Sequence, residues 1–387
     1  MITFADRLNT VEEYYFSRKL REVALLKSQG KPIINLGIGS PDMEPPARVI
    51  SAINDSMKDA VAHKYQSYQG LPELREAMTE FYMQHYGVGL SPLTEVLPLM
   101  GSKEGIMHIS MAFLNPGDEV LIPNPGYPTY SSVTKLVGAV PVFYDLVADN
   151  DWCPDLVALE KSDLSKVKIM WVSYPHMPTG ATASNKVFEN IIAFAKRHNI
   201  LGINDNPYSF VLNDYPRSIL KYKDAKEVCL ELNSLSKTFN MAGWRVGMVL
   251  GKEEYINAIL KVKSNMDSGM FYGIQIGAIE ALKCSKMWFT SLNSVYEERR
   301  QKVWELARAL NCTYDINATG LFVWAKLPQA FKSVEFIDKV LKEHSIFIAP
   351  GTIFGSNGEG YIRFSLCAPL EDLQDAISRV TRVAIEQ

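Results

Sequence analysis

The sequence is poor in cysteine and histidine, and neither residue is arranged to bind a metal or to form a disulfide framework. Its five cysteines contain no CxxC pair, and its six histidines show no ligand spacing with cysteines or carboxylates. We therefore expect reduced thiols in a cytoplasmic protein, and no metal site. The cysteines are Cys153, Cys229, Cys284, Cys312 and Cys367.

Long hydrophobic runs and an excess of basic charge are also missing. No apolar run approaches the ~20 residues that cross a bilayer, and the N-terminus lacks the basic and then apolar order of a signal peptide. The net charge is −3, so we expect neither a nucleic-acid nor a membrane partner. With 47% apolar and 21% charged residues, the composition is that of an ordinary globular protein.

Short apolar runs alternate with helical periodicity over residues 95–250. Continuous apolar strands separated by helices are typical of an α/β fold, in which helices cover both faces of a mostly parallel sheet. Ligands bind such sheets beyond the carboxyl ends of the strands. The pattern predicts strands at 95–100, 119–122, 168–173, 200–204, 228–233 and 246–250, and helices at 103–113 and 184–198.

A length of 387 residues suits two domains. A long helical stretch runs from 253 to about 310, and strands are predicted at 321–326 and 361–365. We expect a large, ligand-binding domain at 46–285. A smaller α/β domain would combine 1–45 with 286–387.

The segment 234–247 (SLSKTFNMAGWRVG) places Lys237 among small hydroxylated residues, with Arg245 eight positions further on. A nearby cation lowers the pKa of an amine and can hold an anion, which suits a lysine that forms an imine with an anionic aldehyde. The hydroxyls of Ser234 and Ser236 and the Arg245 guanidinium would suit a phosphate. Taken alone, the lysine of an SxSK tetrapeptide is more often simply exposed to solvent than reactive. The longer pattern favours the reactive site.

This segment resembles the Schiff-base lysine motif of the class I/II aminotransferases of fold type I. Further motifs of that family follow one another in the expected order from Gly39 to Arg363. The resemblance implies pyridoxal phosphate as cofactor, with Lys237 as the Schiff-base lysine.

The resemblance also assigns residues around the cofactor. Asp205 would pair with the pyridine nitrogen and Tyr208 would donate to the ring oxygen O3′. Gly101, Ser102 and Lys103 lie between a predicted strand and helix, where a helix N-terminus favours an anion, and would bind the phosphate. A strand-end carboxylate that caps a turn and a plain serine cap are the alternatives from these residues alone.

Four further positions follow from the same resemblance. Tyr127 would stack on the pyridine ring, whereas Tyr130 would only pack. Tyr65 would reach the phosphate of the neighbouring subunit, which implies a homodimer. Gly39 and Arg363 would bind the α-carboxylate of the substrate. Arg363 lies inside an apolar strand and therefore calls for an anion, although a structural ion pair is the alternative.

One motif departs from the family. Where the family has NPxNPTG, this sequence reads Tyr174-Pro175-His176-Met177-Pro178-Thr179-Gly180. Met177 cannot donate the hydrogen bond that the family asparagine gives to O3′. We therefore expect the lysine imine to titrate at higher pH than is usual for the family, unless His176 supplies a donor.

The expected activity is transfer of the amino group of an L-amino acid to a 2-oxo acid, with 2-oxoglutarate as the expected acceptor, by ping-pong kinetics. Lys237 would move the proton. Alanine, aspartate, aromatic, methionine and diaminopimelate donors all remain open, and segment 263–271 is similar to one in alanine-type and LL-diaminopimelate-type members. The alternatives are a C–S β-lyase or synthase, a non-catalytic regulator that binds the cofactor, and a structural protein of the same fold.

Overall fold

A seven-stranded sheet forms the centre of the larger part of the molecule. The computed structural model describes residues 2–13, 15–329 and 331–385. The strand order is β2-β8-β7-β6-β5-β3-β4, and all neighbours are parallel except that β8 runs antiparallel to β2 and β7. The strands are β2 (Val96–Leu99), β3 (Glu119–Asn124), β4 (Val140–Asp145), β5 (Val167–Val172), β6 (Leu201–Asp205), β7 (Cys229–Ser234) and β8 (Gly247–Gly251).

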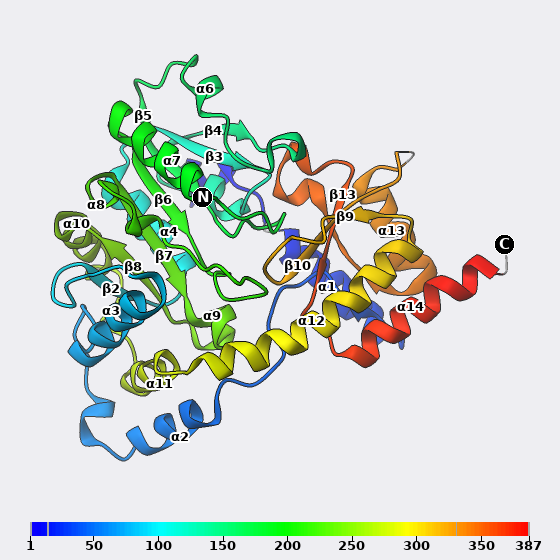
Figure 1. Cartoon of the computed structure of the whole chain (residues 1–387), viewed down its shortest axis with the longest axis horizontal. Coiled ribbons are helices and arrows are strands. Elements are labelled where there is room, and N and C mark those ends of the chain that lie inside the picture. The colour runs from blue at the N-terminus through cyan, green and yellow to red at the C-terminus, as the bar shows by residue number, and fades with distance from the viewer. Residues whose placement is uncertain (1, 14, 330, 386–387) are drawn as a thin grey trace.

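Helices cover both faces of this sheet, as expected. Successive residues of β5 point to opposite sides: Met170 belongs to one hydrophobic core, whereas Ile169 and Trp171 belong to another. Figure 1 shows the sheet between its helices. The first core includes side chains of α3 (Pro72–Tyr86), α7 (Asn185–His198) and α11 (Tyr272–Leu282), and the second those of α4 (Ser102–Phe113), α5 (Pro128–Leu136) and α10 (Glu253–Lys263).

The helix α7 illustrates how the sequence sets these elements. The hydroxyl of Ser184 accepts a hydrogen bond from the Val187 N–H, which caps the first turn. Asn199, at φ 54°, ends the helix in the left-handed conformation that asparagine tolerates. The apolar face of α7 is buried against the sheet through Phe188, Ile191, Ile192, Phe194 and Ala195.

Two details differ from the sequence prediction. The edge strand β4 was not predicted; its sequence VPVFYD is apolar, but it contains Pro141, and only one of its six residues is buried. The helical stretch 253–310 is three helices: α10, α11 and α12 (Lys286–Ala309). The helical conformation is interrupted between α10 and α11, in a segment that contains Gly269 with φ +89°.

The second part of the molecule joins the two ends of the chain. Its antiparallel sheet has the order β12-β13-β10-β9, and β1 (Ile34–Asn35) pairs in parallel with β11 (Ile346–Phe347). Its other elements are β9 (Thr313–Tyr314), β10 (Phe322–Lys326), α13 (Ser333–His344), β12 (Ala349–Pro350), β13 (Tyr361–Ser365) and α14 (Leu370–Ile385). A separate hydrophobic core gathers residues of 16–36 with those of 292–380, and on this ground we propose the division into 46–285 and 1–45 plus 286–387.

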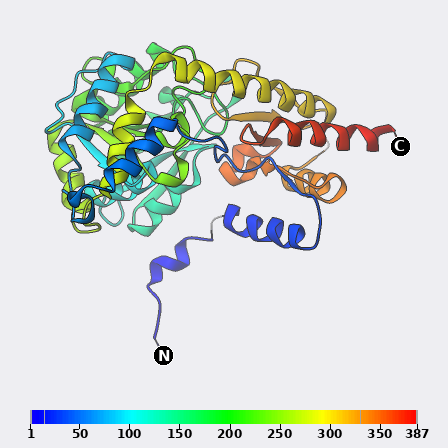
Figure 2. The same ribbon diagram turned by 90° about the horizontal axis from the view of Figure 1, so that it is seen from below.

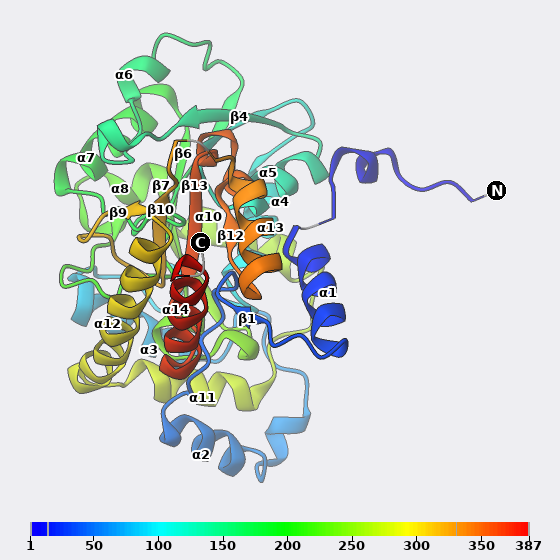
Figure 3. The same cartoon turned by 90° about the vertical axis from the view of Figure 1, so that its right-hand side faces the viewer.

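The N-terminal segment lies at the edge of the molecule and its first described residues project outward, as Figures 2 and 3 show. It contains the 3-10 helix η1 (Asp6–Thr10), which has no buried residue and lies beside α5, and α1 (Tyr15–Ser28), which buries Phe16 and Val23. The remaining short elements are α2 (Ala47–Ser56), η2 (Ala60–His63), η3 (Ala148–Asn150), α6 (Leu156–Leu159), η4 (Ile219–Lys221), α8 (Ala225–Val228), α9 (Leu235–Thr238), η5 (Ala242–Trp244), η6 (Gly351–Phe354) and η7 (Ser356–Gly358).

Among the described residues, no helix combines the length and the apolar character that a membrane span requires.

Candidate active site

A cavity of about 440 Å³ lies beyond the carboxyl ends of β6 and β7, where the two parts of the molecule meet. It brings together most of the residues that the sequence singled out. Gly101 directly precedes a lining residue, whereas Tyr65 does not line the cavity. The predicted residues among its lining are Gly39, Ser102, Lys103, Tyr127, Asp205, Tyr208, Ser234, Ser236, Lys237, Arg245 and Arg363.

Lys237 enters the cavity from α9, the short helix that follows β7 directly. Its Nζ donates to the carbonyl oxygen of Gly39 at 2.6 Å. Burial lowers the pKa of Lys237 to about 8; the Cys367 thiol opposes this, and the guanidinium groups of Arg363 and Arg245 lower the pKa further. At pH 7 about a tenth of the amine is therefore neutral, and so nucleophilic, which is far more than for an ordinary lysine.

Asp205 ends β6 and is only 5% exposed. Its Oδ2 accepts a hydrogen bond from the hydroxyl of Tyr130 at 2.8 Å, whereas Oδ1 has no hydrogen-bond partner in the part of the chain that the structure describes. Burial raises the pKa of Asp205 to about 6, Tyr130 lowers it, and Glu231 raises it. A buried carboxylate oxygen without a partner is costly, and a protonated ring nitrogen in the cavity would satisfy it.

Arg245 and the start of α4 form a concentration of anion-binding groups. The Arg245 guanidinium donates to the Ala242 carbonyl at 2.8 Å and to the Ser236 hydroxyl at 3.4 Å. It lies so close to Gly101, whose φ is +89°, that any Cβ there would collide with Nη2. Only glycine fits this approach, which sets the N-terminus of α4 beside the guanidinium.

The remaining groups at this end of the cavity complete that arrangement. The hydroxyls of Ser234 and Ser236 are 2.9 Å apart. Lys103 lies in the first turn of α4, and burial followed by the charge of Arg245 lowers its pKa. A dianionic phosphate would neutralise this cationic, hydroxyl-lined region, so the residues fit the phosphate of the predicted cofactor.

Arg363 lies in the middle of β13 and is 4% exposed. Its Nη2 donates to the carbonyl oxygen of Gly37 at 2.9 Å, and Nη1 contacts the sulfur of Met177 at 3.2 Å. The guanidinium carbon lies 3.8 Å from the ring centroid of Phe322 and 4.6 Å from that of Phe354. Aromatic faces stabilise a guanidinium without neutralising it, so it keeps its charge for an anionic ligand.

The two predicted tyrosines lie on the cavity wall. Burial raises the pKa of the Tyr208 hydroxyl well above its ordinary value, so this group remains a hydrogen-bond donor. Its ring makes an edge contact with Phe322. Tyr127 caps the N-terminus of α5 and meets the ring of Tyr130 edge-on, with centroids 5.6 Å apart.

Met177 lines the cavity, whereas His176 is not among the lining residues. His176 is buried with its Nδ1 2.8 Å from the hydroxyl of Thr179, and burial lowers its pKa to about 3. The methionine sulfur is a weak acceptor for Arg363 and offers the cavity no donor.

Sequence reasoning underestimated Tyr130 and missed several wall residues. Tyr130 packs as expected, stacked on Trp171 at 4.8 Å, but its hydroxyl also holds Asp205. An aromatic ring with a polar tip close to a predicted cofactor site is the signal that could have indicated this contact. The missed apolar wall consists of Phe16, Leu20, Ile38, Phe322 and Phe354, which come from segments far apart in the sequence.

Comparison with known proteins identifies the class to which this fold and site belong. Residues 31–380 match the family model "Aminotransferase class I and II", and the chain belongs to that family. It is therefore a transaminase of fold type I, and its cofactor is pyridoxal phosphate.

Individual relatives cover nearly the whole chain. An LL-diaminopimelate aminotransferase of Maridesulfovibrio salexigens is 40% identical over 98% of both chains, and one of Dehalococcoides mccartyi is 39% identical over 97% of both. The solved structure of substrate-bound BacF from Bacillus subtilis is similar with a TM-score of 0.94 and 35% identity, covering 99% of this chain and 98% of that one. An aromatic aminotransferase from Pyrococcus horikoshii gives 0.88 and 29%, covering 98% of both.

The raised pKa of Asp205 predicts a pH-dependent stability of the cofactor-free protein. The folded-state pKa of Asp205 is about 6, above the ordinary value near 3.9. Below pH 4 the carboxyl is protonated in both states and does not reduce the free energy of unfolding. As the pH rises through 6, the buried carboxyl ionises and the free energy of unfolding falls. At pH 8 the penalty is on the order of 3 kcal/mol. Asp205→Asn should therefore unfold at a higher urea concentration than the parent at pH 8, and the difference in midpoint should shrink towards pH 4. The exposed Asp214→Asn is the control; a parallel pH profile for Asp205→Asn would contradict the expectation.

The Met177 substitution predicts an altered titration of the cofactor-loaded protein. Met177→Asn should lower the pKa read from visible absorbance, because an amide donor draws charge from the ring oxygen, which then holds the neighbouring proton less strongly. Met177→Leu adds no donor and should leave that pKa in place. An unchanged pKa in Met177→Asn would show that the missing amide donor does not raise the pKa of the imine.

Proposed function

We propose that this transaminase moves the amino group of an L-amino acid to a 2-oxo acid in two half-reactions at one cavity, with ping-pong kinetics. The observation that carries the proposal is that Lys237, the unpartnered Oδ1 of Asp205 and the Arg363 guanidinium all belong to one cavity. They supply a proton-transferring amine, an acceptor for a ring nitrogen and a site for a carboxylate. The alternative of a structural protein leaves all three unexplained.

Each group at the cofactor end has a proposed task. Bound pyridoxal phosphate supplies an electron sink for the charge that develops at the substrate α-carbon. Asp205 holds its ring nitrogen protonated, Tyr208 donates to its ring oxygen, and Tyr127 stacks on its ring. Lys237, with its pKa near 8, takes and returns the proton. The phosphate of the cofactor is held by Gly101, Ser102, Lys103, Ser234, Ser236 and Arg245.

Arg363 and Gly39 orient the substrate in this proposal. A planar guanidinium can hold the α-carboxylate with two parallel hydrogen bonds, and the Gly39 backbone can approach the same group. The backbone at position 39 lies so close to the ring of Phe322 that a Cβ there would collide with the ring, so the contact between these two residues requires glycine. Both substrates carry an α-carboxylate, so the same clamp serves the amino donor and the oxo-acid acceptor, for which we propose 2-oxoglutarate.

Two donor classes have specific support. Relatives that are about 40% identical are LL-diaminopimelate aminotransferases, which supports LL-diaminopimelate as the donor. An apolar or aromatic amino acid is favoured by the cavity wall beside Arg363, where Phe16, Leu20 and Ile38 offer apolar surface.

We further propose that the active protein is a cytoplasmic homodimer in which Tyr65 contacts the phosphate of the neighbouring subunit. Tyr65 is 90% exposed, which supports a role outside its own subunit. Tyr68, Met266 and Phe271 are also substantially exposed, and their segments pack together through the hydrogen bond from Lys263 to the Tyr68 carbonyl. A partner subunit would bury this apolar surface.

The first experiment is the visible spectrum of the purified protein with a panel of amino donors, beside Lys237→Ala. We expect a Lys237-dependent band that one donor class converts and that 2-oxoglutarate restores. Conversion with release of pyruvate and ammonia, without an oxo acid, would instead identify a lyase. A band that no donor converts would favour the regulator.

Arg363 can be tested through the substrate. Arg363→Gln should raise KM for amino acids by roughly two orders of magnitude, because it removes a buried charged partner of the α-carboxylate. An amine without a carboxylate, such as 2-phenylethylamine, is the matched control and should react equally slowly with both forms. Equal KM values for amino acids would leave Arg363 with a structural role only.

A further inference from the structure

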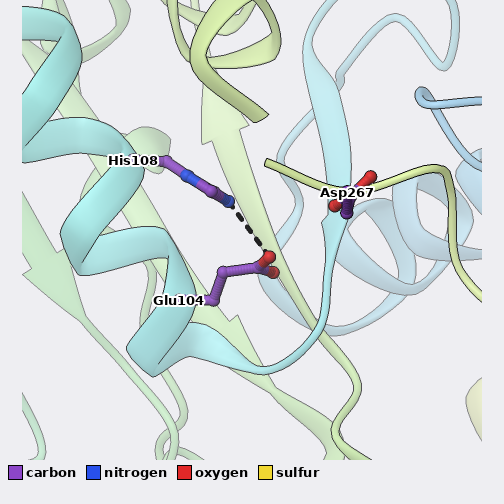
Figure 4. A group of neighbouring side chains, drawn as sticks. All are labelled: Glu104, His108 and Asp267. Atoms are coloured by element: carbon purple, nitrogen blue, oxygen red, sulfur yellow. Dashed lines mark ion pairs between the residues drawn. The ribbon is translucent and has the colours of Figure 1, made fainter. Parts of the chain in front are cut away.

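A cluster of buried and partly buried titratable side chains lies outside the cavity and has no part in the proposed chemistry. Lys263, on the last turn of α10, is 1% exposed, and its Nζ lies 2.7 Å from Oδ2 of Asp267. Figure 4 shows Asp267 beside Glu104 and His108 of α4, whose facing atoms Oε1 and Nε2 are 3.1 Å apart. Buried ion pairs contribute little net stability, so the pair of Lys263 and Asp267 calls for another explanation.

A metal ion does not explain the cluster. Glu104, His108 and Asp267 each have a ligand atom within 4.8 Å of the others. The ammonium group of Lys263 lies at hydrogen-bond distance from Asp267 and would repel a cation there. Lys263 itself therefore supplies the positive charge that pairs with Asp267.

The contacts of Lys263 lead to the loop that carries Tyr65. Its Nζ also donates to the carbonyl oxygen of Tyr68 at 3.1 Å. Asp267 accepts a hydrogen bond from the Gly269 N–H at 2.9 Å, and Gly269 lies so close to the backbone of Gln66 that only glycine fits. The segment after α10 is thus fastened to the chain one to three residues beyond Tyr65.

The other side of the cluster leads to the phosphate-binding end of the cavity. Oε2 of Glu104 accepts a hydrogen bond from the Met100 N–H at 2.6 Å, immediately before Gly101. The cluster therefore lies between the start of α4 and the Tyr65 loop. The ring of Tyr65 is 90% exposed, so its own packing does not fix its direction, and backbone contacts of the loop must do so.

We propose that Lys263 and Asp267 are positioning residues that hold the Tyr65 loop in the orientation needed to contact the cofactor phosphate of a second copy of this chain. The inference rests on the proposed function, namely a homodimer with Tyr65 acting across its interface. A hydroxyl donates well to a phosphate oxygen only over a narrow range of distance and angle. A loop held by a buried ammonium meets that requirement, whereas a freely moving loop does not.

The test is a double-mutant cycle on cofactor affinity. Lys263→Met is combined with Asp267→Asn, so that no unpaired charge remains buried and the hydrogen bond to Gly269 can persist. The dissociation constant of pyridoxal phosphate is measured for the parent dimer, this paired variant, Tyr65→Phe and their combination. We expect the paired variant and Tyr65→Phe each to weaken binding about tenfold, and the combination to be no weaker than either alone.

Two comparisons separate positioning from a loss of folding. Binding of pyridoxal, which lacks the phosphate, should be unaffected by the paired variant. Lys283→Met, which removes an exposed ion pair to Glu280, should bind pyridoxal phosphate like the parent. Size-exclusion chromatography and thermal unfolding establish that each variant remains a folded dimer.

The outcomes distinguish this inference from the proposed function. Independent losses that multiply in the combined variant, or a paired variant that binds pyridoxal phosphate normally, would overturn the positioning role. So would a Tyr65→Phe variant with unchanged affinity, since nothing would then remain to be positioned. Lack of any Lys237-dependent cofactor band would instead overturn the proposed function itself.

Discussion

The concentration of positive charge in one cavity is the constraint on which the rest of the site depends. Lys103, Lys237, Arg245 and Arg363 line it, and Asp205 is the only carboxylate among the described lining residues. Like charges in a partly desolvated space raise one another's free energy, and this contributes to the lowered pKa of both lysines. The cavity therefore favours anions. A cofactor phosphate and a substrate carboxylate would both relieve the repulsion, while Lys237 gains the neutral form that reacts.

The fold separates these charges so that each meets a different ligand group. Neighbouring parallel strands β6 and β7 end at the same edge of the sheet, which places Asp205 beside the segment of Lys237. Arg245 is kept near the N-terminus of α4 by the close approach to Gly101, so two sources of positive potential coincide there. Arg363 comes instead from β13 of the other sheet. The α-carboxylate site and the phosphate site thus belong to different parts of the molecule, and relative movement of those parts would change the distance between them.

Local patterns together with the family resemblance singled out most of the residues that line the cavity, whereas contacts between distant segments could not be predicted. Asp205 ends one buried strand, Lys237 lies three residues beyond another, and Arg363 interrupts an apolar one, so each is visible in a short stretch of sequence. The fold class followed equally from the apolar runs of β3, β5, β6 and β7. The hydrogen bond from Tyr130 to Asp205 joins residues 75 apart, and no periodicity reports such a pairing. The close approach of Gly269 to the backbone of Gln66 was missed for a related reason, because the two residues lie far apart in the sequence.

The replacement of an asparagine by Met177 shows how the same charge constraint shapes a local substitution. An amide oxygen would hold the Arg363 guanidinium by a directional hydrogen bond, whereas a thioether offers a soft and weak acceptor. The guanidinium is still oriented, because the Gly37 carbonyl and the faces of Phe322 and Phe354 remain in contact with it. None of these contacting groups carries a negative charge. Loss of the amide thus weakens one restraint on Arg363 while it preserves, and even strengthens, the demand of the cavity for a carboxylate.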